Sequence, residues 1–154
     1  MAKEIVPDPA VFGWTWPAFG AAAAVSTLIA APLTTLAGNR RVWIASHLVM
    51  ALGVAAPLFI PGIGGVLVSA VGVGGTFMVA TMAGLKEARA LAGADAARLM
   101  GAMTASFAGG QIAGPAAASL WLRAGGSLSA VQWAAVLLLL ASAGALTLRN
   151  AGRQ

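Results

Sequence analysis

The sequence predicts an all-α membrane protein, a polytopic helix bundle with about five transmembrane helices. Of the 154 residues, 60% are hydrophobic and 8% are charged, whereas an ordinary soluble domain carries about 25% charged residues. The charged residues also leave four long uncharged stretches, which are residues 9–39, 42–85, 99–122 and 124–148. None of these stretches shows the alternating polarity of a transmembrane β-strand. A soluble domain, a disordered chain and a disulfide scaffold are therefore excluded.

The uncharged stretches divide into helices by length. A transmembrane helix needs about 20 apolar residues, so three of the stretches fit one helix each and the longest fits two. Pro61-Gly62 lies near the middle of the longest stretch and predicts a turn there. A polar connector is expected over residues 86–95. The predicted spans are residues 14–36, 42–60, 63–85, 96–122 and 128–148.

The basic residues predict the orientation. Seven cations fall on one side of the predicted bundle and two on the other, and the side with more cations is expected to be cytoplasmic. Residues 1–13 are then extracytoplasmic, and residues 149–154 form a cytoplasmic tail of a multi-pass protein of the cell (inner) membrane. No basic stripe with interleaved aromatic residues predicts nucleic-acid binding. The larger group comprises Arg40, Arg41, Lys86, Arg89, Arg98, Arg149 and Arg153, and the smaller group Lys3 and Arg123.

Small and polar residues suggest how the spans are arranged. The first, third and fourth spans carry polar residues near their centres and are expected to face an interior. The second and fifth have apolar centres and are predicted to be peripheral. The glycine pair Gly110 and Gly114, and the glycines Gly72, Gly74 and Gly75, predict close approach to neighbouring helices.

Four polar residues within the spans are candidates for solute binding: Ser69, Thr76, Thr104 and Gln111. Members of each pair, Ser69 with Thr76 and Thr104 with Gln111, are seven residues apart and share a helix face. The alternative for each hydroxyl is a hydrogen bond to its own helix backbone. The alternative for Gln111, whose amide offers two donors and two acceptor lone pairs, is a hydrogen bond between helices. Pro115, one turn later, is expected to loosen this helix.

The residues expected of an enzyme or a metalloprotein are missing. The sequence contains no cysteine and one histidine, His47, so neither a multi-histidine nor a cysteine metal site is expected. No Gly-x-Ser-x-Gly nucleophile motif is present. We therefore predict no enzymatic activity, no metal and no cofactor. His47 is interpreted as a packed imidazole, with a proton relay or a membrane enzyme as alternatives.

The connector at residues 86–95 carries four charged residues, Lys86, Glu87, Arg89 and Asp95. Lys86 and Arg89 are expected to complement the dipole at the C-terminal end of the third span. Asp95 is expected to cap the fourth span and can reach Arg98. The alternative is a gating latch between cytoplasmic helix ends.

Residues 74–119 resemble the C-terminal half of major facilitator superfamily transporters, closest to the YbfB/YjiJ type. The resemblance rests on the segments Gly74–Met78, Leu85–Arg89, Gly93–Arg98, Met103–Phe107 and Gly110–Pro115. It implies that the five spans are the last five of twelve helices. It also implies that the second and fifth spans, as helices nine and twelve, are peripheral. Gly38-Asn39-Arg40-Arg41 is similar to a shortened basic loop motif of that superfamily.

The resemblance implies a fragment of a secondary active transporter that moves a small solute by alternating access. Its expected partners are the lipid bilayer, the solute and the missing N-terminal helices, and proton coupling is left open because no carboxylate lies within a span. Substrate in such transporters binds between the two halves near the membrane midplane. The alternative from a different class is a small multi-pass scaffold or assembly protein that is complete as written.

Overall fold

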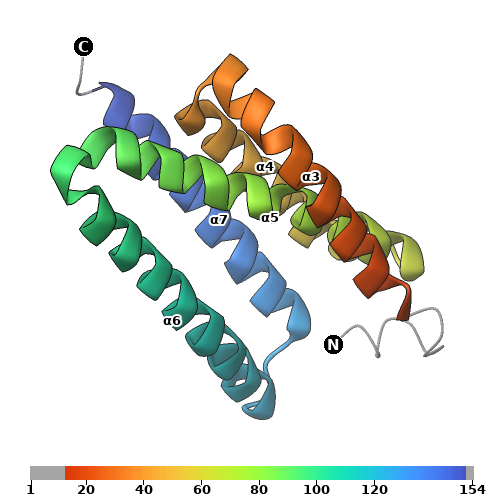
Figure 1. The fold of residues 1–154 in the computed structure, drawn as a ribbon. Helices are drawn as coiled ribbons and strands as arrows, with labels where there is room; N and C mark the ends of the chain where they lie inside the picture. Colours follow the sequence, from red (N-terminus) through yellow and green to blue (C-terminus); the bar gives the residue numbers. More distant parts are fainter. Residues whose placement is uncertain (1–12, 152–154) are drawn as a thin grey trace.

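The computed structural model describes residues 13–151, apart from the side chains of residues 149–151. The chain forms five long helices joined by short turns (Figure 1). They are α3 (Thr15–Ala37), α4 (Asn39–Phe59), α5 (Ile63–Ala92), α6 (Ala96–Arg123) and α7 (Leu128–Ala151), with a 3₁₀ turn, η1 (Gly93–Asp95), between α5 and α6. The predicted all-α fold class is confirmed. The predicted extracytoplasmic segment, except Gly13, and residues 152–154 of the tail lie outside the described residues.

The connections between helices are short because each contains a glycine with a positive φ angle, which other residues rarely adopt. Pro61-Gly62, predicted as a turn, separates α4 from α5, and Gly62 has φ 72°. Gly38 alone separates α3 from α4 and has φ 84°. The same role falls to Gly93 and Gly125 at the two remaining connections.

The predicted polar connector at residues 86–95 is largely helical, which corrects the sequence interpretation. Helix α5 continues to Ala92, and η1 then turns the chain into α6. The reason is that Lys, Glu, Ala, Leu and Arg are strong helix formers, so the helix continues beyond its apolar stretch. The capping role predicted for Asp95 is also wrong. Asp95 occupies the N-cap position without a side-chain hydrogen bond, because it leaves η1 at φ −86°, ψ 7° rather than in the extended conformation typical of an N-cap.

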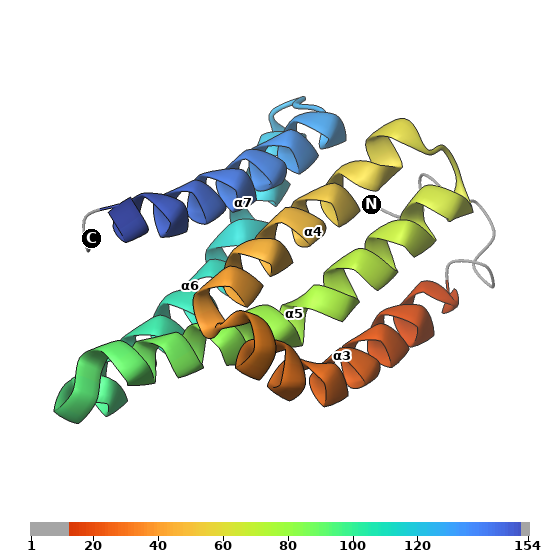
Figure 2. The same ribbon diagram turned by 90° about the horizontal axis from the view of Figure 1, so that it is seen from above.

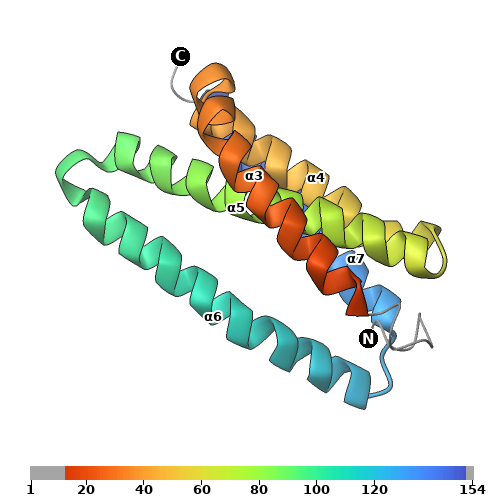
Figure 3. The same cartoon turned by 45° about the vertical axis from the view of Figure 1, so that its right-hand side comes forward.

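Four helices pack side by side in the order α3, α5, α4, α7 (Figure 2). One apolar cluster joins α3, α4 and α5 through Ala30, Val42, Val79 and Ala83. A second joins α4 to α7 through Ala51, Ala55 and Val136. Helix α6 diverges from this row beyond its turn with α5 (Figures 1 and 3). None of its residues is buried.

Small residues, rather than apolar centres, determine which helix is central. Gly53 of α4 lies against Gly72 of α5 so closely that a Cβ atom on Gly53 would be 3.2 Å from the Gly72 Cα. Gly74 of α5 lies directly against the main chain of Phe19 in α3. The prediction that the second span is peripheral is therefore wrong for this chain, since α4 packs between α5 and α7. In lipid, close packing at small residues drives helix association, and the apolar centre of α4 carries such residues.

The close packing predicted for the glycines of α6 is also wrong within the described chain. A Cβ atom on Gly110 or Gly114 would meet no other atom within 4 Å, and the same holds for Gly75 in α5. The interior expected for the fourth span is accordingly not supplied by α3, α4, α5 or α7.

Four helical stretches of the described residues are long and apolar enough to cross a membrane: Thr15–Ala37, Asn39–Phe59, Ile63–Arg123 and Leu128–Leu148. The third has 61 residues and contains α5, η1 and α6. The chain is thus an all-α membrane helix bundle. Because α5 and α6 run back on each other at η1 (Figure 1), five crossings remain the prediction.

Candidate functional site

Helix α6 carries two of the predicted solute-binding residues, Thr104 and Gln111, and both are exposed. The Thr104 hydroxyl donates a hydrogen bond to the main-chain carbonyl of Met100 at 3.0 Å. The two residues are seven apart in one continuous helix, so their side chains project from the same side, about 20° apart. Helix α6 therefore presents an exposed polar face near its centre.

Helix α5 carries the other two, Ser69 and Thr76, in a more enclosed setting. Thr76 is buried, and its hydroxyl donates to the carbonyl of Gly72 at 2.6 Å, with Val73 at 3.3 Å. Thr76 is one turn from Gly72, which contacts α4, so it falls on the side of α5 that packs against α4. Ser69 is half-buried.

The structure does not bring the four predicted residues into one cluster. Thr76 and Gln111 lie at similar depth, since they are 17 and 16 residues from the near ends of η1, Gly93 and Asp95, or ~25 Å of helix. However, Thr76 faces the packed side of α5 and Gln111 is exposed on α6. The two helices meet instead at Phe77 and Phe107, whose ring centroids are 5.6 Å apart.

The hydroxyls largely follow the alternative of bonding to their own helix. Besides Thr76 and Thr104, Ser26 donates to Ala23 at 2.8 Å and Thr27 donates to the same carbonyl at 2.9 Å. His47 is half-buried, its Nδ1 lies 2.9 Å from the carbonyl of Trp43, and the two rings are 6.1 Å apart. This contact fits the packed imidazole better than a relay.

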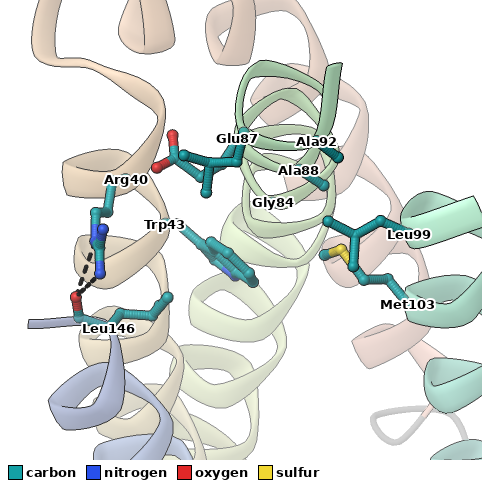
Figure 4. Close-up of a pocket in the computed structure, with 10 residues that line it drawn as sticks. Arg40, Trp43, Gly84, Glu87, Ala88, Ala92, Leu99, Met103 and Leu146 are labelled. Atoms are coloured by element: carbon teal, nitrogen blue, oxygen red, sulfur yellow. Dashed lines mark hydrogen bonds between the residues drawn. The ribbon is translucent and has the colours of Figure 1, made fainter. Parts of the chain in front are cut away.

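A second feature of the structure is a cavity of about 380 Å³ at the end of the bundle that contains Arg40 (Figure 4). Helices α4, α5, α6 and α7 all contribute to it. The ring of Trp43 packs over Gly84, where a Cβ atom would be 3.1 Å from the indole. The lining is otherwise apolar apart from Arg40 and Glu87, and includes Leu91, Leu99 and Met103.

At this end, two cations join helices that are far apart in sequence. The guanidinium of Arg40 in α4 donates two hydrogen bonds to the carbonyl of Leu146 in α7, from Nε at 2.9 Å and from Nη2 at 2.6 Å (Figure 4). Lys86 of α5 donates from Nζ to the Thr34 hydroxyl of α3 at 2.8 Å. Both acceptors are uncharged groups, so neither contact is an ion pair.

Comparison with known proteins identifies the chain at the level of its family. The model of the family described as "Uncharacterised MFS-type transporter YbfB" matches residues 1–147. The chain belongs to this YbfB family of major facilitator superfamily transporters. The resemblance noted on residues 74–119 is confirmed and extends over most of the chain. Neither a curated protein nor a solved structure matches significantly.

Membership of the YbfB family, together with the four apolar helical stretches, makes the chain part of a multi-pass membrane transporter family. Sequence reasoning missed the tie between Arg40 and Leu146. Arg40 was interpreted as a topology signal and as part of a basic loop motif, because a helix-end arginine has the same appearance in sequence whether it faces water or a neighbouring helix. The signal that could have found it is the C-terminal end of the fifth span, whose carbonyls attract cations.

Proposed function

We propose that this chain is a fragment of a secondary active transporter that moves a small solute across the membrane by alternating access. The YbfB family match supports a transporter. In this proposal, Gln111 and Thr104 contact the solute pathway, and Thr76 and Ser69 support the same side of it. Coupling to protons would require a titrating group from the N-terminal helices, which we propose as the chain's main protein partner.

The observation that carries the proposal is the exposure of α6 along its whole length. This helix carries no charged residue from Leu99 to Leu122 and belongs to the candidate membrane-spanning stretch Ile63–Arg123. None of its residues is buried, and it exposes Gln111 and Thr104 near its centre. Polar groups within a span must find partners or line a water-filled cavity, since hydrocarbon offers neither. The face is therefore best explained as one side of a solute pathway that other helices complete.

Uptake by the whole gene product in proteoliposomes tests the proposal. Replacing both residues, Gln111→Leu with Thr104→Val, is expected to lower uptake at least about tenfold, because polar contacts to solute would be lost. Ser106→Ala is the matched control, since its hydroxyl is also exposed on α6 and bonds its own backbone at 2.9 Å, but it lies on the opposite side of the helix. Unchanged uptake in the double variant would remove both residues from the pathway.

We also propose that the N-terminus is extracytoplasmic and the C-terminus cytoplasmic. The exposed turns offer labelling positions in a cysteine-free chain. Ser129→Cys at the start of α7 and Ala94→Cys in η1 are both exposed and should react with an impermeant maleimide from opposite sides. Labelling of Ser129→Cys from outside the cell would support the proposed orientation. Labelling of both cysteine variants from the same side of the membrane would contradict five crossings.

The alternative is a small multi-pass scaffold or assembly protein. The exposed apolar side chains along α6, such as Ile112 at 76% and Leu120 at 69% exposure, would then contact a second protein. This function predicts a stable oligomer of the 154-residue chain in detergent and no uptake by any longer product of the gene.

A further inference from the structure

The cavity at the Arg40 end of the bundle contains a carboxylate that has no partner in the described part of the chain. Glu87 of α5 is half-buried and lines this cavity, and its side chain extends toward α4 (Figure 4). Among the described residues, its carboxylate has neither a hydrogen bond nor an ion pair. A half-buried carboxylate beside apolar side chains is costly without a positive or hydrogen-bond-donating partner. Glu87 therefore provides a position for such a group.

Arg40 of α4 supplies the opposite charge in the same cavity. Its guanidinium donates from Nε and Nη2 to the carbonyl of Leu146, which is uncharged, and its other N–H groups remain for an anion. Arg40 and Glu87 do not form an ion pair with each other. The cavity thus contains one position for an anion and a separate one for a cation.

The rest of the cavity wall is apolar, and the cavity lies at one boundary of the predicted membrane region. Trp43 of α4 and Leu99 and Met103 of α6 contribute to a space of about 380 Å³. The uncharged residues 42–85 follow Arg40 and Arg41 and end directly before Lys86 and Glu87. Both cavity charges therefore stand where the apolar part of the helices ends, which is the depth of lipid headgroups in a bilayer.

These features define the chemistry of the ligand. A ligand that satisfies both side chains carries a negative and a positive charge, and one that also uses the apolar wall carries hydrocarbon. A soluble solute would leave the wall unused, and a lipid with a single charge would leave either Arg40 or Glu87 unpaired. The combination fits a membrane lipid with a zwitterionic headgroup.

We propose that this cavity binds phosphatidylethanolamine from the bilayer. The phosphate lies against the guanidinium of Arg40, the primary ammonium donates to the carboxylate of Glu87, and the start of an acyl chain packs against Leu99 and Met103. Charge-assisted hydrogen bonds of this kind are about twice as strong as neutral ones, and basic pockets between transmembrane helices bind lipid headgroups. The proposal requires only that the chain lies in a bilayer, so it does not depend on the transport function.

The test compares three phospholipids that have the same dioctanoyl chains and differ in the headgroup: ethanolamine, glycerol or choline. Binding to the purified whole gene product in detergent is measured by native mass spectrometry. Phosphatidylethanolamine is expected to bind at least about tenfold more tightly than the others, because phosphatidylglycerol has no ammonium for Glu87 and phosphatidylcholine has no N–H to donate. Equal binding of all three, or tighter binding of phosphatidylglycerol, would overturn the proposal. So would the absence of binding, which would mean that water or another part of the longer protein fills the cavity.

Free phosphoethanolamine distinguishes a lipid site from a site for a soluble solute. It carries the same two charges but no hydrocarbon, so it should bind at least about tenfold more weakly than the lipid. Equal affinity for the two would overturn the assignment to a lipid.

Two carboxylate variants separate the role of Glu87 from general charge at this end of the bundle. Glu87→Gln should lower the affinity for phosphatidylethanolamine about tenfold, to that for phosphatidylcholine, and should not weaken phosphatidylglycerol binding. Asp95→Asn is the matched control, since Asp95 is exposed and does not line the cavity, and it should leave the three affinities unchanged. If Glu87→Gln shifts the melting temperature but keeps the headgroup preference, or if Asp95→Asn removes that preference, the proposal is wrong.

The position of the phosphate is tested at Arg40. Arg40→Lys keeps the positive charge but loses the planar arrangement of N–H donors, so it should weaken phosphatidylethanolamine and phosphatidylglycerol by the same factor, roughly threefold. A loss confined to phosphatidylethanolamine, or no loss for either lipid, would contradict the contact between the phosphate and Arg40.

Discussion

Glycine has opposite surroundings in two regions of the molecule, the contact between α4 and α5 and the surface of α6. At the first, Gly53 and Gly72 bring two backbones together, and a Cβ atom on Gly72 would be 3.0 Å from the Gly53 Cα. On α6, four glycines, Gly101, Gly109, Gly110 and Gly114, have open space where a Cβ atom would be. The same residue type thus marks a completed interface in one region and a free surface in the other.

The difference supports the proposal that α6 packs against helices outside the described residues. Glycine lowers helix stability relative to alanine, so four glycines in an exposed helix carry a cost with no packing gain inside this chain. In lipid, that cost is offset only where another backbone approaches. The row of α3, α5, α4 and α7 contains glycines of both kinds, since Gly20, Gly75 and Gly144 also have open space, whereas none of the glycines of α6 meets a neighbouring helix.

The largest expected effect comes from filling the completed interface. Gly72→Leu should destabilise the bundle by about 3 kcal/mol, because the added side chain meets the backbone of α4 rather than a flexible side chain. Gly110→Leu on α6 should not destabilise the 154-residue chain and should stabilise it by up to about 1 kcal/mol, because leucine favours a helix more than glycine does and open space surrounds this position. Thermal unfolding in detergent measures both. Equal losses in the two variants would show that α6 is packed within the chain.

The same Gly110→Leu variant, measured in the whole gene product, tests whether further helices cover α6. If further helices cover α6, the variant that does not destabilise the short chain should destabilise the longer protein by about 1–3 kcal/mol. The absence of destabilisation in both proteins would leave the glycines of α6 without a packing role.

The arrangement of helices was predictable from sequence only in part. Apolar length and the turn at Pro61-Gly62 were sufficient to place five helices, because bilayer thickness and glycine geometry act locally. Which helix lies at the centre was not predictable from polar residues, since the packing of α4 depends on Gly53 meeting Gly72 across two helices. The extension of α5 to Ala92 was missed because charge was interpreted as an interruption, although Lys86 and Arg89 favour helix.

The candidate site residues were also predictable from sequence only within one helix. Helix periodicity correctly placed Thr104 and Gln111 on one side of α6, because spacing within one helix fixes the direction of side chains. Periodicity could not show that Thr76 turns toward α4, since that depends on how α5 is rotated in the bundle. The ties made by Arg40 and Lys86 join residues 106 and 52 positions apart, a separation that no local pattern reports.

An effect smaller than that of the glycine variants is expected from the hydrogen bonds that join α4 to α7. Arg40→Gln removes a guanidinium that donates two hydrogen bonds to one carbonyl, and we expect a loss of about 1.5 kcal/mol in the free energy of unfolding. Arg40→Lys should recover part of this, because an ammonium keeps the charge near the end of α7 but cannot donate from two nitrogens. Arg41→Gln is the control, since Arg41 is exposed. If Arg41→Gln costs as much as Arg40→Gln, general charge at this end, and not the bond to Leu146, stabilises the pair.

The smallest effect concerns the contact between α5 and α3. The Thr34 hydroxyl donates to its own helix at Ala30 and Ala31 and accepts from Lys86, so Thr34→Val leaves the Lys86 ammonium without its acceptor. Lys86 is exposed, which allows water to replace the lost partner, and its tie is therefore weaker than that of the half-buried Arg40. A double-mutant cycle of Thr34→Val and Lys86→Met should give a coupling of about 0.5 kcal/mol. A coupling near zero would mean that α3 is held to α5 by packing alone, at the Ala30–Ala83 cluster and where Gly74 meets Phe19. A coupling energy above about 1.5 kcal/mol, the loss expected for Arg40→Gln, would show that the Lys86 contact is the stronger of the two.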